Sequence, residues 1–203
     1  MREHSFGDKD FEIESTEIAY KGFFGVSKFR LRHRLFNGGW SELINRELFQ
    51  RGDAVGVLVF DPKHDLVGVV EQFRIGAIRC VSGPWQYEVI AGMVGKGGDP
   101  RDVARDELRE EAGLDLDTLI PICDYFVSAG GTDEKMFLFC ALTDLKGKGG
   151  VFGLSSENED IMFQVWTFDE MQRAFHSGYL NSAAMTISFQ WLKNFRQEFY
   201  NRD

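Results

Sequence analysis

Apolar and polar residues alternate in the first quarter of the chain, as they do along strands that bury one face. Residues 28–35 alternate between basic side chains and mainly apolar ones, and Asn37-Gly38-Gly39 is typical of a hairpin turn. We therefore expect short strands over residues 11–20 and 22–36, followed by a further strand or bend over residues 44–49.

The middle and end of the chain hold apolar runs separated by turns, which is typical of buried strands. Residues 54–61 (AVGVLVFD) are the clearest example. Further strands are expected at 66–75, 85–92, 119–128, 135–142 and 162–168, and helices from Asp99 to about Ala112, from Phe168 through His176 and over 182–200. Strands dominate and helices are interspersed, so the pattern favours a mixed α/β sandwich over a regular βαβ wind.

The predicted helix that begins after Asp99 carries three carboxylates on one face. Glu107, Glu110 and Glu111 are spaced i, i+3 and i+4, a Gly-rich loop precedes the helix, and Gly113 is a helix stop. Carboxylates this close repel one another unless a positive charge lies between them, and divalent cations prefer oxygen ligands. The segment therefore predicts a site for a metal-bound phosphate. The alternative is a solvated acidic helix face balanced by the arginines of the same helix.

Length and charge narrow the class of protein. A chain of 203 residues fits one domain, or one domain with a small extension. The net charge of −9 argues against a nucleic-acid backbone or an anionic membrane as the main partner. A small anionic ligand stays compatible, because a bound metal ion inverts the local sign of charge. No run has the form of a secretory signal or reaches membrane-spanning length, so we expect a soluble, cytoplasmic protein.

The cysteines indicate a reducing environment. Cys80, Cys123 and Cys140 are odd in number and widely spaced, and they form neither a CxxC pair nor a zinc-binding pattern. We expect them to be reduced, buried thiols.

Residues 92–114 resemble the Nudix box, usually written G-x5-E-x7-R-E-U-x-E-E-x-G-U, where U is an aliphatic residue. Gly92 matches the first glycine. The second half matches in register at Glu107, Leu108, Glu110, Glu111, Gly113 and Leu114. Segments outside the box, among them EQFRIGA and SAGGTDE, extend the resemblance over nearly the full length. The chain as a whole resembles the bacterial ADP-ribose pyrophosphatase branch of the Nudix hydrolase superfamily.

Three positions depart from the pattern of that family. Gly98 stands where the box has its first glutamate, and Asp106 replaces an arginine that helps to hold a catalytic glutamate. Ala129 stands where the branch typically carries a proline. Asp106 also lies i, i+4 from Glu110, where like charges repel. These departures bear on rate and substrate more than on fold or metal binding.

The resemblance implies an α/β (α+β) fold class: a Nudix fold, in which a mixed-sheet α/β/α sandwich carries a small N-terminal antiparallel β-sheet domain. The expected division is residues 1–45 for the N-terminal sheet and 46–203 for the Nudix hydrolase domain. A homodimer that exchanges the N-terminal sheet is also implied. Neither a nucleic acid nor a membrane is expected as a partner.

The implied reaction is the Mg²⁺-dependent hydrolysis of ADP-ribose to AMP and ribose 5-phosphate, with Mn²⁺ as a substitute ion. Two alternatives stay open. One is hydrolysis of another nucleotide sugar, such as GDP-mannose. The other is a weakly active or inactive homologue that binds ADP-ribose.

The resemblance also implies roles for individual residues. The metal ligands are the carbonyl of Ala91 and the carboxylates of Glu107, Glu111 and Glu159. The catalytic residues are Glu110 and Glu157, the latter activating the attacking water from a mobile loop. The substrate-binding residues are Phe23, Arg46, Glu47, Arg74 and Glu134.

Several of these residues have a plainer interpretation. Glu157 fits an ordinary flexible acidic loop, and Arg74 fits a surface ion pair. Phe23 fits a core aromatic as well as a ring that stacks on adenine, and Phe24 is an equal candidate for that stacking.

Overall fold

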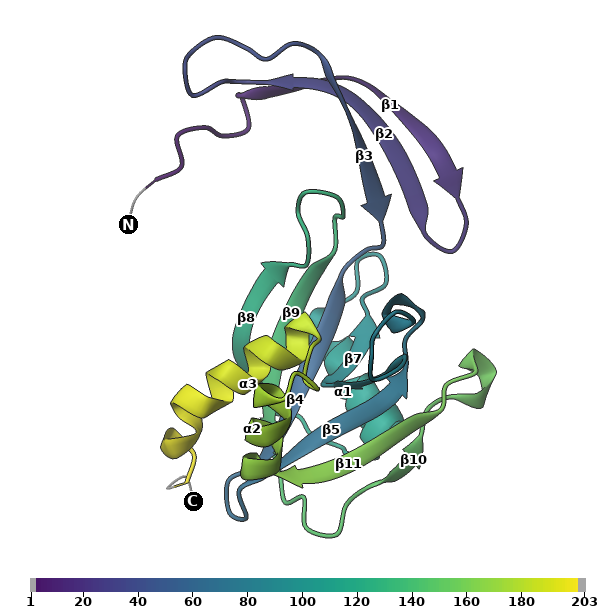
Figure 1. Ribbon diagram of the computed structural model, residues 1–203, viewed down its shortest axis with the longest axis vertical. Coiled ribbons are helices and arrows are strands. Elements are labelled where there is room, and N and C mark those ends of the chain that lie inside the picture. Colours follow the sequence, from purple (N-terminus) through teal and green to yellow (C-terminus); the bar gives the residue numbers. More distant parts are fainter. Residues whose placement is uncertain (1–2, 201–203) are drawn as a thin grey trace. The chain divides into compact units, whose positions relative to one another are not determined.

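The computed structural model of the chain describes residues 3–200, apart from the side chain of Glu157. It divides into two compact units (Figure 1). The first, here called the β unit, comprises Met1–Gly52 and Phe126–Glu134. The second, here called the sandwich unit, comprises Asp53–Tyr125 and Lys135–Asp203.

The β unit is built on a three-stranded antiparallel sheet. Its strands are β1 (Phe11–Lys21), β2 (Gly25–His33) and β3 (Ile44–Gln50), in the order β1-β2-β3. Every residue of β1 is exposed to solvent. The loop over residues 126–134 is fastened to β3, because the Phe49 N–H donates to the Gly131 carbonyl at 2.8 Å. The register of β1 on β2 shifts between Ile13 and Ser15 and again between Ile18 and Tyr20, and the faces of the sheet have little covering.

The sandwich unit is built on an eight-stranded mixed sheet, as counted over the part of the chain that the structure describes. Its main path runs β10-β11-β5-β4-β9-β8, while β6 pairs with β5 and β7 with β4. The strands are β4 (Ala54–Asp61), β5 (Leu66–Phe73), β6 (Trp85–Glu88), β7 (Ile90–Met93), β8 (Ile120–Phe126), β9 (Lys135–Leu142), β10 (Gly150–Phe152) and β11 (Ile161–Thr167). Strand β4 is parallel to β9 and antiparallel to β5 and β7, so the sheet is mixed, as predicted.

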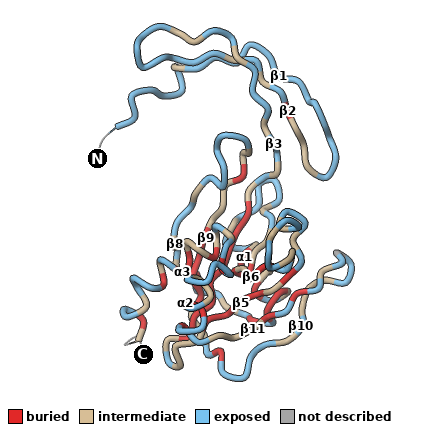
Figure 2. The backbone as a smooth tube through the Cα atoms, viewed as in Figure 1, coloured by how far each residue is buried: buried red, intermediate tan, exposed pale blue. Residues whose placement is uncertain are grey.

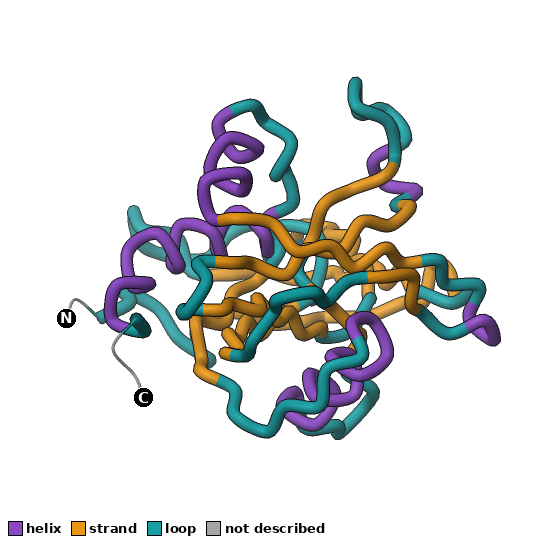
Figure 3. Tube along the Cα trace, turned by 90° about the horizontal axis from the view of Figure 1, so that it is seen from below, coloured by secondary structure: helices purple, strands orange, loops and turns teal. Residues whose placement is uncertain are grey.

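Helices cover both faces of this sheet (Figure 3). Helix α1 (Pro100–Ala112) packs on one face and contributes Leu108 to a core with Val55, Val70 and Phe163. Helices α2 (Phe168–His176) and α3 (Ala183–Phe195) pack on the other face. Buried residues gather along the central strands between these layers (Figure 2). The α/β/α sandwich expected from the sequence is therefore confirmed.

Local structure differs from the sequence predictions in a few places. The single strand expected over 85–92 is divided between β6 and β7, because Val89 interrupts the pairing. Strand β10 was not predicted, since a three-residue strand leaves no periodic pattern. The last helix ends at Phe195 and is followed by a 3₁₀ turn over Arg196–Glu198.

The cysteines are free thiols, but the prediction that all are buried is wrong. Cys140 is buried, Cys80 is partly buried, and Cys123 is exposed on β8. Strand β8 lies at the edge of the sheet and has exposed residues at alternate positions, which explains the exposure of Cys123. No helix among the described residues combines the length and apolar character needed to cross a membrane.

Candidate active site

The sequence sets the position of helix α1 through both of its ends. The Asp99 carboxylate accepts a hydrogen bond from the Arg101 N–H at 2.8 Å, and proline follows at the first helical position. At the other end Gly113 takes a left-handed conformation with φ of 63°, and its N–H donates to the Arg109 carbonyl. Both ends of the helix lie where the sequence predicts them. The glutamates therefore share one helix face, as expected.

Glu111 is the most buried carboxylate of that helix, with 2% of the residue exposed. Its Oε2 accepts a hydrogen bond from the Ala91 N–H of β7 at 3.1 Å. Burial, followed by repulsion from Glu107 and Glu159, raises the pKa of Glu111 to about 8, although the Ala91 N–H and the charge of Arg74 oppose the rise. An ionised Glu111 therefore needs additional positive charge at this position.

Glu107 lies one turn before Glu111 and directly against the backbone of Gly92. A Cβ placed on Gly92 would be 1.7 Å from Glu107 Oε1, a distance that no real contact permits. Only glycine at this position leaves room for the carboxylate. The Glu107 carboxylate thus lies against the residue that follows Ala91, whose carbonyl is the predicted backbone ligand.

The loop between β10 and β11 is fastened to the same helix. The Gly153 N–H donates to the carbonyl of Glu110, which is itself half-buried. Within the loop, Glu159 Oε2 accepts the Leu154 N–H at 3.2 Å. The charge of Glu159 is close enough to raise the pKa of Glu111. Glu157 lies in the 3₁₀ turn of this loop, and its side chain is outside the described part of the structure.

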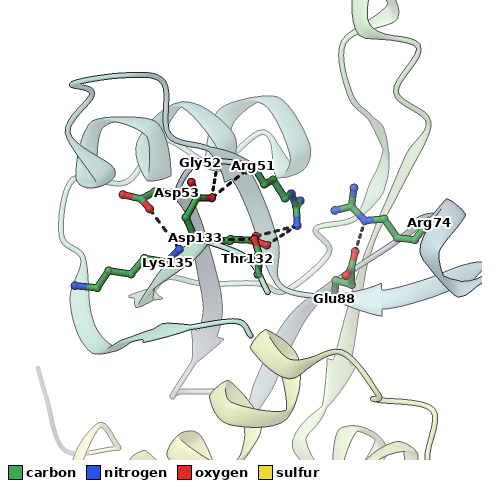
Figure 4. Close-up of polar contacts among 9 residues, drawn as sticks. Arg51, Gly52, Asp53, Arg74, Glu88, Thr132, Asp133 and Lys135 are labelled. Atoms are coloured by element: carbon green, nitrogen blue, oxygen red, sulfur yellow. Dashed lines mark hydrogen bonds and ion pairs between the residues drawn. The ribbon is translucent and has the colours of Figure 1, made fainter. Parts of the chain in front are cut away.

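Arg74 follows β5 and pairs with Glu88 of β6. Its Nε donates to Glu88 Oε2 at 2.7 Å, which leaves the two terminal nitrogens of the guanidinium outside that bond (Figure 4). The Arg74 side chain is 41% exposed, whereas that of Glu88 is 18% exposed. Arg74 is therefore an ion-pair partner, as the plainer interpretation held, and it also lowers the pKa of Glu111 through its charge.

The carboxylates and carbonyl around Glu111 are suited to a divalent cation. The charge of Arg74 does not offset the burial of Glu111 and the repulsion from its two acidic neighbours, and hard cations prefer such oxygen donors. Glu107, Glu111 and Glu159 do not bring one oxygen each within 4.8 Å of one another, whereas Asp61, His64 and Asp144 do.

The Asp61 cluster, although tighter, is already satisfied by the protein. Asp61 Oδ1 accepts the N–H groups of Lys63 and His64, and Oδ2 accepts the Leu145 N–H at 3.0 Å and contacts His64 Nδ1 at 2.8 Å. This carboxylate stabilises the turn after β4.

The remaining predicted substrate-binding residues belong to the β unit. Arg46 and Glu47 of β3 line a cavity of about 550 Å³ on the sheet, together with Lys28 and Arg30 of β2. Phe23 is 87% exposed in the turn between β1 and β2 and lies edge-on to the Phe24 ring. A core role for Phe23 is therefore wrong, whereas its stacking on adenine stays a prediction.

Glu134 is nearly buried and is held by an arginine that sequence reasoning missed. Both carboxylate oxygens lie 2.9 Å from Arg51 Nη1 (Figure 4 labels Arg51 and its neighbours). The Asp133 carboxylate next to it accepts the Arg51 N–H at 3.0 Å. Glu134 and Asp133 thus close the 126–134 loop onto the end of β3, and a contact of Glu134 with ribose stays a prediction.

Two further observations concern residues that the sequence left open. Asp106, which replaces the family's arginine, pairs with Arg109 Nη1 at 2.6 Å, and Arg109 Nε pairs with Asp115 at 2.9 Å. Arg109 is thereby engaged on the exposed side of the helix. Glu88 was not predicted as a site residue, although an acid inside the mainly apolar segment WQYEVIAG could have indicated it.

The chain is similar to proteins of known family. A family model described as the NUDIX domain matches residues 50–184. The ADP-ribose pyrophosphatase of Escherichia coli (strain K12) is 40% identical over 197 residues, which cover 97% of this chain and 94% of that protein. The ADP-ribose pyrophosphatase of Haemophilus influenzae is 38% identical and covers 93% of this chain and 88% of that protein.

More distant relatives carry other names. The GDP-mannose pyrophosphatase of Pectobacterium atrosepticum is 29% identical over 88% of this chain and 92% of that protein. A solved structure titled as an ADP compounds hydrolase has a TM-score of 0.67 with 18% identity, and the match covers 94% of this chain and 98% of that one. At that identity the structural likeness supports the fold alone.

Proposed function

The chain belongs to the NUDIX family, and from this premise we propose that it hydrolyses ADP-ribose to AMP and ribose 5-phosphate with a divalent cation, Mg²⁺ or in its place Mn²⁺. The observation that carries the proposal is the 40% identity to an ADP-ribose pyrophosphatase over 97% of the chain. The geometry of the site also supports hydrolysis with a divalent cation, because Glu111 is buried with Glu107, Glu159 and Arg74 around it.

The metal-binding groups are the carboxylates of Glu107, Glu111 and Glu159 and the carbonyl of Ala91. A cation held by these groups would supply positive charge to neutralise the diphosphate and the charge that develops as its bond breaks. Glu111 must lose its proton to serve as a ligand, and the Ala91 N–H holds its Oε2 in place meanwhile. Gly92 leaves room for the Glu107 carboxylate against the backbone that follows Ala91.

The reaction itself requires an activated water. Oxygen of that water forms a bond to one phosphorus, the bond from this phosphorus to the bridging oxygen breaks, and the water proton passes to a carboxylate. Glu157 is the proposed acceptor of that proton, with Glu110 as the second catalytic carboxylate. The bond between Gly153 and the Glu110 carbonyl supports this proposal, because it ties the loop of Glu157 to helix α1.

Arg74 is the proposed phosphate ligand. Its Nε pairs with Glu88 in the absence of substrate. A guanidinium that exchanges this partner for the diphosphate can present its N–H groups to a phosphate oxygen. Phe23, Arg46, Glu47 and Glu134 are the proposed contacts to adenine and ribose.

The β unit supports the proposal of a homodimer. Its strand β1 exposes Phe11, Ile13, Ile18 and Tyr20, each at least 49% exposed. Apolar side chains on a thin sheet are usually covered by a partner. A second copy of the chain, exchanging the region over residues 1–45, is the proposed partner. Light scattering during size-exclusion chromatography tests this: a single peak at twice the chain mass of 23.2 kDa is expected, and a monomer at micromolar concentration contradicts it.

A second candidate is hydrolysis of another nucleotide sugar, favoured by Ala129 in place of the branch's proline and by the 29% identity to a GDP-mannose pyrophosphatase. A third is an ADP-ribose binder with little or no activity, which Gly98 and Asp106 favour.

One panel of nucleotide sugars separates the three candidate functions. With Mg²⁺ and a series of nucleotide sugars, phosphatase-sensitive product is expected from ADP-ribose first. Faster turnover of GDP-mannose supports the second candidate, and tight ADP-ribose binding without product supports the third.

A further inference from the structure

Two buried polar atoms have no hydrogen-bond partner among the described residues: the amide nitrogen of Gln72 and the hydroxyl oxygen of Ser188. Ser188 lies in α3, with none of its surface exposed. Gln72 lies in β5 and is 7% exposed. A buried donor without an acceptor lowers stability, so each such group calls for an explanation.

The strand register places Gln72 beside the proposed phosphate ligand. Side chains at positions 70, 72 and 74 share one face of the sheet, because alternate residues of a strand point the same way. Val70 belongs to the core under α1, so this is the face that α1 covers. Gln72 therefore lies between that core and Arg74.

The ion pair between Arg74 and Glu88 must pass over Gln72. Glu88 is opposite Val70, Gln86 is opposite Gln72, and the Arg74 N–H bonds to the Pro84 carbonyl. Glu88 and Arg74 thus start four residues apart along the ladder, about 13 Å at the usual rise of a strand. Their side chains meet at 2.7 Å, so both lean inward and converge above the pair formed by Gln72 and Gln86. Covering by this ion pair is consistent with the burial of both glutamines, each 7% exposed.

We propose that Gln72 is a positioning residue for Arg74: its amide donates to the Glu88 carboxylate when the substrate diphosphate draws the guanidinium of Arg74 away. Glu88 is largely buried, so losing the Arg74 donor would leave its carboxylate poorly paired at high cost. The amide beneath it supplies a replacement donor and lowers that cost. This inference rests on the proposed role of Arg74 in binding diphosphate.

Gln86 cannot serve in the same way, although it is equally buried. Its amide nitrogen already donates to the carbonyls of Gly83 and Trp85, both at 3.2 Å. Those bonds hold the loop before β6. Of the two glutamines, Gln72 is therefore the one whose amide nitrogen is unpaired.

The test uses an ADP-ribose analogue with a methylene group in place of the bridging oxygen, titrated calorimetrically into the full-length protein with Mg²⁺. Gln72→Met keeps the length of the side chain but cannot donate. We expect it to weaken binding of the analogue about tenfold, the worth of one hydrogen bond to a charged group, and not to lower Tm. The control is Ser188→Ala, which removes the other unpaired group and is expected to raise Tm with unchanged binding.

The mechanism also predicts that the effect depends on Glu88. In a Glu88→Gln background, Gln72→Met should change the affinity by less than about twofold, because coupled residues are not additive. In steady-state assays Gln72→Met should raise KM more than it lowers kcat, since the exchange of partners occurs on binding.

Equal affinity of wild type and Gln72→Met for the analogue overturns the inference and leaves the proposed function intact. A wild type that does not bind the analogue overturns both. If Gln72→Met does not fold, the wild-type side-chain amide resonances of Gln72 decide: they must shift on adding the analogue, and unchanged resonances overturn the inference.

Discussion

Two buried carboxylates in the sandwich unit show opposite behaviour. Asp61, after β4, is 1% exposed, and Glu111, in α1, is 2% exposed. Burial opposes ionisation of Asp61, but the N–H of Leu145, the His64 ring and the N–H groups of the turn outweigh it and lower its pKa. Burial raises the pKa of Glu111 to about 8, and the carboxylate of Glu107 adds to the effect.

The difference lies in the groups that the fold places around each carboxylate. The Asp61 turn supplies its own donors, so its charge is satisfied by the fold and contributes to stability. Glu111 has one backbone donor and the charge of Arg74 in its favour, but burial and its acidic neighbours outweigh them, so the fold compensates its charge incompletely. A buried acid that the fold leaves uncompensated is a better indicator of a functional site than a tight acidic cluster.

The largest expected effect comes from Glu111→Gln, which removes the charge at the uncompensated site. Turnover of ADP-ribose at saturating Mg²⁺ should fall by a factor on the order of 10² to 10³, because the amide is a poor ligand for a hard cation. The metal-free protein should be no less stable than wild type. Steady-state kinetics and thermal unfolding in a chelator measure the two quantities, and an unaltered rate would contradict the metal assignment.

Asp61→Asn should reverse that pattern. The amide cannot accept all the bonds that the carboxylate accepts, so the free energy of unfolding should fall by about 2–4 kcal/mol. The activity per folded molecule should stay within about twofold of wild type, since Asp61 has no proposed role in the reaction. Denaturant unfolding measures the first quantity. An Asp61→Asn variant that keeps full stability, or that folds but is inactive, would contradict the contrast between Asp61 and Glu111.

The two sites should also respond oppositely to pH. Glu111 has a folded pKa of about 8 against an ordinary value of 4.5, so the folded protein holds the extra proton. Without metal, Glu111 therefore lowers the free energy of unfolding progressively as pH rises from about 4.5 to about 8. Asp61 contributes stability at neutral pH that is lost only as pH falls through its lowered pKa.

The measurement is Tm against pH in a chelator for wild type and Glu111→Gln. Wild type should lose more Tm than the variant between pH 6 and pH 8, and added Mg²⁺ should restore more at pH 8 than at pH 6. Parallel curves for the two proteins would argue that Glu111 is ionised throughout this range.

The smallest effect is expected from Asp106→Arg, which restores the residue typical of the family. The change removes the pair with Arg109, which lies on the exposed side of the helix and away from the core. The rate should stay the same or rise a few-fold, as measured by kcat for ADP-ribose. A large loss would give Asp106 a role of its own.

The sequence predicted what local chemistry decides and missed what tertiary packing decides. The ends of α1 follow from Asp99, Pro100 and Gly113, so the shared face of Glu107 and Glu111 was predictable. The pairing of Arg74 with Glu88 was not, because it depends on the register of β5 with β6. The same holds for Arg51 and Glu134, which are 83 residues apart.

Burial was harder to predict than position. Cys123 is exposed because β8 is an edge strand, which composition does not reveal. Gly92 matched a motif, yet the physical reason for a glycine there is tertiary: a Cβ would lie 1.7 Å from the Glu107 carboxylate, which approaches from another element. The pKa of Glu111 likewise depends on Glu107 of its own helix and on neighbours from three other segments, at Ala91, Arg74 and Glu159.

Proton release on binding Mg²⁺ tests most directly whether Glu111 stays protonated until a cation binds. Calorimetric titration of Mg²⁺ at pH 7, in two buffers of different ionisation enthalpy, counts the protons released. With a pKa of about 8, Glu111 holds its proton at pH 7 until the cation replaces it. Wild type should therefore release roughly one proton per cation that Glu111 binds, and Glu111→Gln should release none. Binding without proton release in wild type would contradict the account.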